Sequence, residues 1–401
     1  MAWQDVEPME ERIRFVLQAT REGKGFSELC REFGISRKTG YKWVARYRAW
    51  GLAGLHELSR RPRASPTRMP EEVEALVLRE RHRHRTWGPK KLRAVLATKY
   101  GVVPGPAVST IGNLLKRHGL TRKTRGRRPV SQPDRRTRTA ATAPNAVWAA
   151  DFKGWFRTRD GHRCDPLTIS DGCSRYVLTC RLVAGQRRDR VRPVFRQVFR
   201  RFGLPDVLRV DNGPPFGSRG VCGLSQLSAW WLQCGIRVEF IEPGHPEQNG
   251  GHERMHRTLK AETTRPPAAT PRAQQARFDR WRREFNHERP HEALGMQRPA
   301  ERYRPSARRY TDHPAPFAYP RHYEVRRVKR QGIIRWRNRV WYIGEALQGM
   351  LVGLIEVDDT RHAVYFGELL VGYLDARTPG SLQPAVPRPP AGPVPAPERE
   401  V

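Results

Sequence analysis

Apolar residues recur at helical spacing in the stretch FSELCREFGISRKTGYKWVARYRAWG, which begins at Phe26. This pattern predicts a helix that ends at Gly34, a turn filled by Ile35, and a second helix capped by Ser36. Two helices joined by such a short turn are typical of a helix-turn-helix unit, although a plain helical hairpin has a similar pattern.

The second helix of this unit is expected to be amphipathic. Basic side chains share its outer face, where they suit the major groove of DNA: Arg37, Lys38, Lys42 and Arg46. Apolar and aromatic side chains are available for its inner face: Tyr41, Val44 and Tyr47. This distribution favours a recognition helix.

A second helical block runs from residue 71 to 120 and resembles another helix-turn-helix, plain or winged. Pro89 falls in the first turn of one of its helices. Ser109 is placed to cap a later helix, and Gly119 to end it. Two such modules in tandem would read a longer site than one.

Short apolar runs replace the helical pattern from Asn145 onward. VWAADFKGWF, DPLTISDG and RYVLTCRLV predict three successive strands, and helical and strand-like stretches then alternate. This order predicts a mixed sheet covered by helices. The segment from Tyr323 to Asp375 has about five short strand-like runs and is consistent with a small β-barrel.

The predicted fold class is therefore multidomain: helix-turn-helix modules, an α/β mixed-sheet core and a small β-barrel. The expected parts are a DNA-binding helix-turn-helix domain (1–60), a second such domain (66–122), a basic linker (123–143), an α/β core (144–307), a β-barrel (320–376) and a disordered proline-rich tail (379–401).

Charge narrows the class of partner. The 401 residues include 75 Lys and Arg against 40 Asp and Glu, a formal net charge of +35. Basic side chains bind phosphates with release of counterions, so double-stranded DNA is the expected partner. The alternative is a solubilising surface, or arginine enrichment in a GC-rich genome. The basic linker would lie along DNA phosphates or act as an inert tether.

No apolar run approaches the roughly 20 residues of a membrane span, and the N-terminus MAWQDVEPMEER is too polar for a signal peptide. We therefore expect an intracellular, cytoplasmic protein. The six cysteines form no C-x-x-C pair, which argues against a zinc ribbon and favours reduced thiols, most of them buried.

Three carboxylates stand at positions that suggest a shared site. Asp151 interrupts the apolar alternation of VWAADFKGWF, Asp211 ends the strand VLRV, and Glu253 lies early in a helix with Arg257 and Lys260 on the same face. Alone, each has an ordinary interpretation: a strand-edge polar residue, a turn starter, or half of a helix ion pair. Together they predict an oxygen-ligand site for two Mg²⁺ or Mn²⁺ ions, with Arg257 and Lys260 facing DNA phosphates.

The runs VWAADFKG, ISDGCSRYVL, VDNGPPF and HPEQNGGHERMHRTLK resemble the catalytic core shared by retroviral integrases and bacterial insertion-sequence transposases. FNHERPHEALGMQRPAERY resembles the stretch that closes this domain in the bacterial branch. The likeness implies an RNase H-like fold with an Asp-Asp-Glu triad, which falls on Asp151, Asp211 and Glu253. Glu247 is a rival for the third position, but it precedes Asn249-Gly250, whereas the family's glutamate follows that pair.

Two features depart from the retroviral pattern. The segment between the second aspartate and the glutamate is longer, and its glycine-rich part, GPPFGSRGVCG, resembles a mobile active-site loop. Only Cys30 precedes Cys164, so the His-Cys zinc domain of retroviral integrases cannot form. Asn212 and His252 could orient waters or phosphates, although a solvated helix position is the simpler expectation for His252.

The resemblance implies a DNA transposase that binds the ends of an insertion sequence and acts on them as a homo-oligomer. Its reaction would be metal-dependent 3′-end cleavage followed by strand transfer into target DNA. The first alternative is a transposase-derived DNA-binding regulator without recombination activity. The second is a plain nuclease of the RNase H type.

Overall fold

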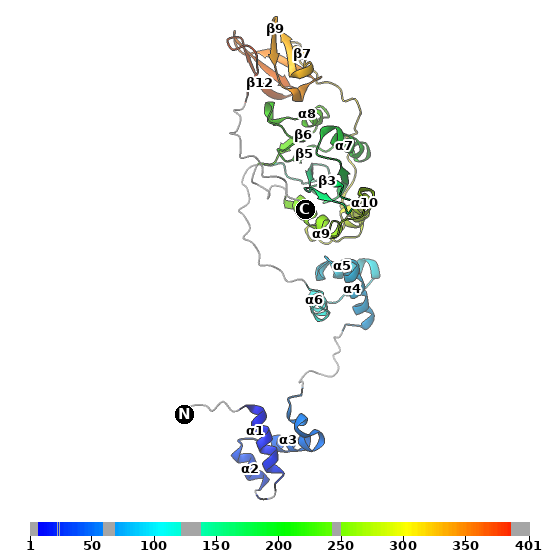
Figure 1. The fold of residues 1–401 in the computed structure, drawn as a ribbon, viewed down its shortest axis with the longest axis vertical. Helices are drawn as coiled ribbons and strands as arrows, with labels where there is room; N and C mark the ends of the chain where they lie inside the picture. Colours follow the sequence, from blue (N-terminus) through cyan, green and yellow to red (C-terminus); the bar gives the residue numbers. More distant parts are fainter. Residues whose placement is uncertain are drawn as a thin grey trace. The chain divides into compact units, whose positions relative to one another are not determined.

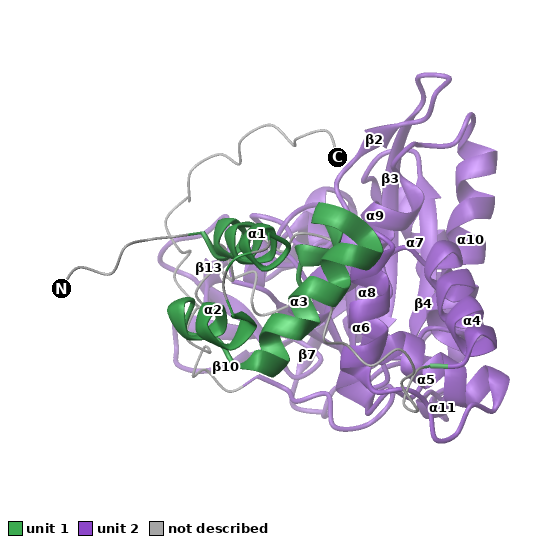
Figure 2. Cartoon of the chain, turned by 90° about the horizontal axis from the view of Figure 1, so that it is seen from below, with its two compact units in different colours: residues 1–69 green, residues 70–401 purple. Residues whose placement is uncertain are grey.

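The computed structural model describes residues 7–58 without 22 and 24, and residues 69–121, 138–242 and 250–385. The chain divides into two compact units, residues 1–69 and 70–401 (Figure 2). Figure 1 shows the helices and strands in chain order. Among the described residues, no helix is both long enough and apolar enough to cross a membrane.

The first unit is a small helical bundle. It contains α1 (Pro8–Ala19), α2 (Phe26–Glu32), α3 (Arg37–Trp50) and the 3₁₀ helix η1 (Gly51–Leu55). Ser36 caps α3, as predicted, by accepting a hydrogen bond of 3.2 Å from the backbone N–H of Thr39. The helices approach closely at Gly40, where a Cβ would lie 2.7 Å from the Cys30 sulfur.

The inner face of α3 differs from the prediction at one position. Trp43 and Val44 are buried in the core of the unit, and Tyr47 packs against its edge. Tyr41, expected on the inner face, is 61% exposed and stacks on Phe26 with ring centroids 4.2 Å apart. Trp43 is therefore the main aromatic residue by which α3 is anchored.

The second unit begins with α4 (Glu71–Arg83), α5 (Pro89–Tyr100) and α6 (Val108–Arg117). Pro89 opens α5 as predicted. Ser109 does not cap α6, because the helix begins one residue earlier and Ala107 is its N-cap. Gly119 follows the end of α6 in a left-handed conformation with φ +65°, which confirms it as the stop.

The central element is a mixed sheet. Its strands are β1 (Val147–Phe152), β2 (Phe156–Arg157), β3 (Arg163–Asp171), β4 (Val177–Val183), β5 (Val207–Val210) and β6 (Arg237–Phe240). β3 pairs antiparallel with β1, β2 and β4, while β5 pairs parallel with both β1 and β6. The predicted mixed sheet is confirmed.

Helices cover both faces of this sheet (Figure 1). They are α7 (Arg188–Phe202), α8 (Gln226–Gln233), α9 (Gly250–Thr263) and α10 (Pro271–His287), with the short α11 (Pro299–Arg302) after them. Residues of α7 and α8 share one core with Trp148 and Ala150 of β1. Residues of α9 and α10 form a second core with β4. Because side chains alternate along a strand, Asp151, the residue after Ala150, faces the opposite side of the sheet, where α9 lies.

The C-terminal strands do not form the predicted barrel. They are β7 (Glu324–Arg327), β8 (Ile333–Trp336), β9 (Arg339–Tyr342), β10 (Leu351–Glu356), β11 (Arg361–Phe366), β12 (Leu369–Asp375) and β13 (Gln383–Pro384). They build an open five-stranded sheet, β13-β12-β11-β10-β7, and a separate β8-β9 pair. A parallel bridge joins Tyr342, the last residue of β9, to Ser381 just before β13, but the two sheets do not close into one continuous barrel. β13 also shows that the predicted disordered tail begins with an ordered strand.

Short 3₁₀ helices complete the described connections: η2 (Val221–Gly223), η4 (Glu292–Leu294), η5 (Arg330–Gly332) and η6 (Glu345–Leu347). Most of the predicted basic linker and the tail beyond residue 385 lie outside the described residues.

Candidate active site

The pairing of β1 with β5 brings the first two carboxylates to one edge of the sheet. The strands are parallel, and Ala149 lies opposite Arg209. Continued by two residues, this register places Asp151 beside Asp211, on neighbouring strands that are about 4.8 Å apart. The two aspartates that the sequence singled out are therefore brought together.

The turn after β5 leaves the Asp211 carboxylate exposed. A Cβ on Gly213 would lie 3.3 Å from the Asp211 Oδ2 atom, so glycine gives this carboxylate room. Asn212 donates its side-chain N–H to the carbonyl oxygen of Ile241 at 2.8 Å. Asn212 thus ties the turn to the residue after β6.

The loop that follows is anchored at its beginning and end. Phe216 is fully buried and stacks on Phe152, with ring centroids 5.6 Å apart. Ser225, which caps α8, donates its hydroxyl to the carbonyl oxygen of Phe216 at 2.8 Å. The loop that the sequence suggested to be mobile is therefore fixed to the core through Phe216.

Helix α9 presents one face to the sheet and the other to solvent. Its buried residues are spaced three or four apart, as expected for an amphipathic helix: His252, Met255, His256 and Leu259. Glu253 lies on the exposed side, one residue after His252. The rival Glu247 lies outside the described residues.

Two histidines connect α9 to β3 through buried hydroxyl groups. The His252 ring contacts the Ser170 hydroxyl through Nδ1 and the Thr168 hydroxyl through Nε2, both at 2.8 Å. The Nε2 atom of His256 lies 2.6 Å from the same Thr168 oxygen, and Thr168 donates to the backbone carbonyl of Asp151 at 3.1 Å. The prediction of a solvated His252 is wrong, because β3 supplies polar partners for its ring.

The charges at this edge affect one another. Burial raises the pKa of Asp151 to about 7, and the negative charges of Asp211 and Glu253 act in the same direction. The positive charge of Lys153 opposes this rise. The carboxylates of Asp211 and Glu253 are thus close enough to Asp151 to raise its pKa, as expected for a cluster of carboxylates.

Burial has the opposite effect on the neighbouring histidines. It lowers the pKa of His252 to about 3, and it lowers the pKa of His256 well below its ordinary value, with the charge of Lys153 adding to the effect. Both rings are therefore neutral near pH 7. Among the described residues, Asp151, His252 and His256 form the one group of side chains with atoms close enough together to hold a metal ion.

Lys153 and His256 are residues that the sequence argument missed. The i, i+4 spacing of His252 and His256 could have identified a shared buried face. Lys153 directly follows β1, and with Arg265 it lowers the pKa of Lys260, after the effect of burial. Lys153 is therefore close enough to both Asp151 and Lys260 to change their pKa values.

The predicted DNA contacts lie at accessible positions. Arg37, Lys38 and Lys42 of α3 are exposed, as is Arg257 of α9, while Arg46 and Lys260 are half-buried. The Lys42 ammonium group lies over the Trp43 ring at 4.0 Å from its centroid. The aromatic anchor of α3 thus also holds one of its basic side chains.

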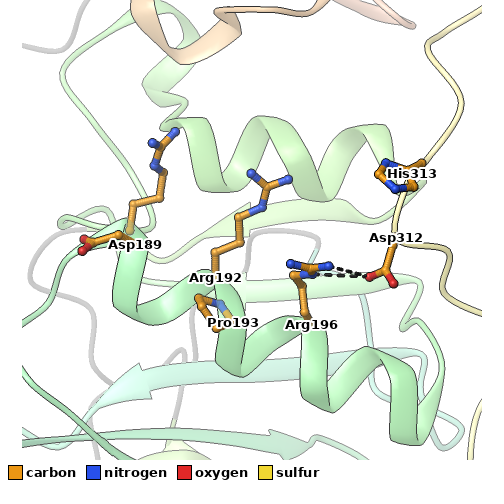
Figure 3. Close-up of a pocket in the computed structure, with 7 residues that line it drawn as sticks. Asp189, Arg192, Pro193, Arg196, Asp312 and His313 are labelled. Atoms are coloured by element: carbon orange, nitrogen blue, oxygen red, sulfur yellow. Dashed lines mark hydrogen bonds and ion pairs between the residues drawn. The ribbon is translucent and has the colours of Figure 1, made fainter.

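A separate pocket of about 360 Å³ is hollowed against α7 (Figure 3). Its lining comprises Arg188, Asp189, Arg192, Pro193, Arg196, Asp312 and His313. Asp312 bonds to Arg196 at 3.0 Å, and Asp189 bonds to Arg187 at 3.2 Å. Because both aspartates are already paired with arginines, this pocket is a poor site for a hard metal ion.

Comparison with known families assigns the parts of the chain. Two models described as Integrase core domain match residues 141–246 and 234–299. Together these two matches make residues 141–299 similar to the integrase core domain. A Helix-turn-helix domain model matches residues 11–63, and a Homeodomain-like domain model matches residues 39–115. The integrase core contains β1 to α10 and therefore the whole carboxylate cluster.

Two curated proteins that are similar to the chain come from bacterial insertion elements. An uncharacterized 39.2 kDa protein of insertion element IS476 from Xanthomonas euvesicatoria is 29% identical over 70% of this chain and 78% of its own length. An uncharacterized 31.7 kDa protein of insertion element IS407 from Burkholderia multivorans is 27% identical over 68% of this chain and 95% of its own length. Among solved structures, the catalytic core domain of BIV integrase is 20% identical, covers 40% of this chain and 93% of that chain, and aligns with a TM-score of 0.32.

Proposed function

We propose that the protein is a DNA transposase whose integrase core cuts the ends of an insertion sequence and joins them to target DNA. The observation that carries the proposal is the parallel register of β1 and β5, which supports a site with Asp151 and Asp211 on adjacent strand ends. The raised pKa of Asp151, to which Asp211 and Glu253 contribute, supports Glu253 as the third member. The names of the insertion-element relatives support the biological role.

The donor set fits divalent ions of the Mg²⁺ or Mn²⁺ type. Burial raises the pKa of Asp151, and repulsion from the carboxylates of Asp211 and Glu253 raises it further, so a bound cation would stabilise the ionised cluster. Asp151, Asp211 and Glu253 would hold two such ions. When bound, a pair of ions supplies activation of the attacking oxygen and stabilisation of the leaving oxygen in phosphoryl transfer.

The remaining residues of the site would position the DNA. Lys153, Arg257 and Lys260 would contact phosphates beside the carboxylates, and His252 and His256 hold α9 against β3 so that Glu253 stays at the same edge. The first cut frees a 3′-hydroxyl by attack of water on a phosphodiester, and that hydroxyl then attacks a target phosphate. This sequence needs no covalent bond between protein and DNA.

The helix-turn-helix modules would supply recognition of the element ends. Arg37, Lys38, Lys42 and Arg46 lie on the helix that would enter the major groove. Because two ends must be cut and joined together, we propose that the protein acts as a homo-oligomer on paired DNA ends.

The test is an assay of the full chain with Mg²⁺ or Mn²⁺ and DNA that carries the inverted ends flanking its gene. The unchanged protein should cleave and join, while Asp151→Asn, Asp211→Asn and Glu253→Gln should each lose both products and keep end binding. Binding without cleavage by the unchanged protein would instead favour a regulator, and cleavage without joined products would favour a plain nuclease.

A further inference from the structure

The His256 ring and the Asp151 carboxylate face each other at a distance slightly longer than a hydrogen bond. The Nδ1 atom of His256 lies 3.7 Å from the Oδ2 atom of Asp151. This distance is too long for a hydrogen bond. His256 is only 4% exposed as a residue, so its ring lies almost wholly inside the protein.

The proton on His256 can be placed by counting hydrogen bonds. Thr168 has one hydroxyl proton, and it donates this proton to the Asp151 carbonyl. Its oxygen must then accept from the Nε2–H groups of both His252 and His256. A neutral His256 ring that carries its proton on Nε2 has a lone pair on Nδ1, the atom nearest the Asp151 carboxylate.

The His256 ring is buried and the Asp151 side chain is 28% exposed, so a cation could reach the space between the lone pair and the carboxylate and would be attracted by both. Two metal–ligand bonds of about 2.1 Å each can span the 3.7 Å between Nδ1 and Oδ2. We propose that His256 is a ligand, through Nδ1, of the divalent ion held by Asp151. This inference rests on the proposed function for the presence of an ion, but the nitrogen ligand goes beyond the carboxylate triad.

His252 serves as the matched contrast on the same helix. Both of its ring nitrogens already have hydroxyl partners, Ser170 on Nδ1 and Thr168 on Nε2. It therefore has no free lone pair for an ion, although it is equally buried and one turn away. The two histidines differ in ligand capacity and share a structural role.

A nitrogen ligand predicts which ions the site prefers. Mg²⁺ favours oxygen ligands and retains water, whereas imidazole suits the later divalent metals. The site should therefore bind Mn²⁺ more tightly than Mg²⁺, by a margin that depends on His256. Substitution His256→Gln keeps an N–H group near the position of Nε2, for the bond to Thr168, and removes Nδ1.

The experiment is electron spin-echo envelope modulation of Mn²⁺ bound to the full chain without an affinity tag. We expect modulation from a directly bound imidazole nitrogen in the unchanged protein and in His252→Gln, and its loss in His256→Gln. Mn²⁺ affinity should fall on the order of tenfold in His256→Gln, with a smaller change for Mg²⁺. Circular dichroism melting would establish that both variants are folded.

The outcomes separate the inference from the proposed function. Bound Mn²⁺ with no nitrogen modulation, or with modulation that persists in His256→Gln, would overturn the ligand role of His256 and leave the carboxylate site standing. No bound Mn²⁺ in the unchanged protein, at concentrations that support DNA cleavage, would overturn the ion site itself. A second variant, His256→Asn, offers an oxygen near the position of Nδ1 and should recover part of the affinity without the nitrogen signal.

Discussion

Gly213 lies directly against the carboxylate of Asp211, where a Cβ would come within 3.3 Å of the Oδ2 atom. A methyl group at this distance is close enough to turn the Asp211 carboxylate away from Asp151, although the added methyl group does not enter the hydrophobic core. We therefore expect Gly213→Ala to lower the cleavage rate by about tenfold or more, because small displacements of a reacting group are costly. Single-turnover cleavage with saturating DNA would measure this rate in the variant and in the unchanged protein.

The control for this substitution is another glycine of the same site. Gly250 begins α9, and a Cβ there would meet no atom of the described residues within 4 Å. Gly250→Ala should leave the cleavage rate nearly unchanged. Equal losses in the two variants would show that the contact with Asp211 is not what matters.

Thr168 connects β3, β1 and α9 through one hydroxyl group. Thr168→Val keeps the shape but leaves the two imidazole N–H donors of His252 and His256 without a partner in a buried place. An unsatisfied buried donor costs about 1–3 kcal/mol. Urea unfolding should therefore show a loss of at least that size, together with slower cleavage.

A second threonine tests whether any lost hydroxyl has this effect. Thr258 lies on α9, and its hydroxyl donates to the Arg254 carbonyl at 3.1 Å on the exposed side. Thr258→Val should change the free energy of unfolding by less than about 0.5 kcal/mol. A comparable loss in both variants would argue against a special role for Thr168.

The sequence predicted the carboxylates better than the groups that support them. Asp151 and Asp211 interrupt or end apolar runs, and such positions are costly for a charge, so their combination with Glu253 already suggests a site. From the sequence alone, His252 is expected to be a solvated helix residue. Its hydroxyl partners lie on a strand 82 and 84 residues away in the chain, so the local sequence does not show them. Long-range partners of this kind leave no local pattern.

The C-terminal sheet and the cap of α6 show the same limit of sequence-based prediction. The strands after Tyr323 were recognisable by their alternation, but whether a sheet closes depends on which edges pair, and here β13-β12-β11-β10-β7 stays open. The cap of α6 was misplaced because Ser109 is a good capping residue by type, whereas the backbone turns helical already at Val108. Local preference identifies an element more reliably than its boundary.

The basic face of α3 should control DNA affinity without affecting chemistry directly. Replacing Arg37 and Lys42 by alanine removes two exposed cations, and each lost phosphate contact should lower the slope of log affinity against log salt by about 1. Binding to element ends, titrated at several salt concentrations, measures both quantities.

A basic residue elsewhere in the same unit provides the comparison. Arg14 is exposed on α1 and is already bonded to Glu11 at 3.1 Å. Arg14→Ala should leave the salt slope within error of the unchanged protein. If it lowers the slope as much as the double substitution does, general charge and not the recognition helix accounts for binding.

Glu80 should make the stability of the α4–α6 region depend on pH. The Glu80 carboxylate is buried, and burial raises its pKa. Hydrogen bonds from Lys99 and Tyr100 lower this pKa, as do the charges of Lys99 and His84, and the net pKa is below the ordinary value. A lowered folded-state pKa stabilises the fold above the unfolded value of about 4.5, and this contribution is lost as pH falls through the folded value. Glu80→Gln should be less stable than the unchanged protein at pH 7, and the difference should shrink below pH 4.5. Urea unfolding of both proteins from pH 3 to 7 measures the difference, and a difference that stays constant over this range would rule out the ionised Glu80 as its source.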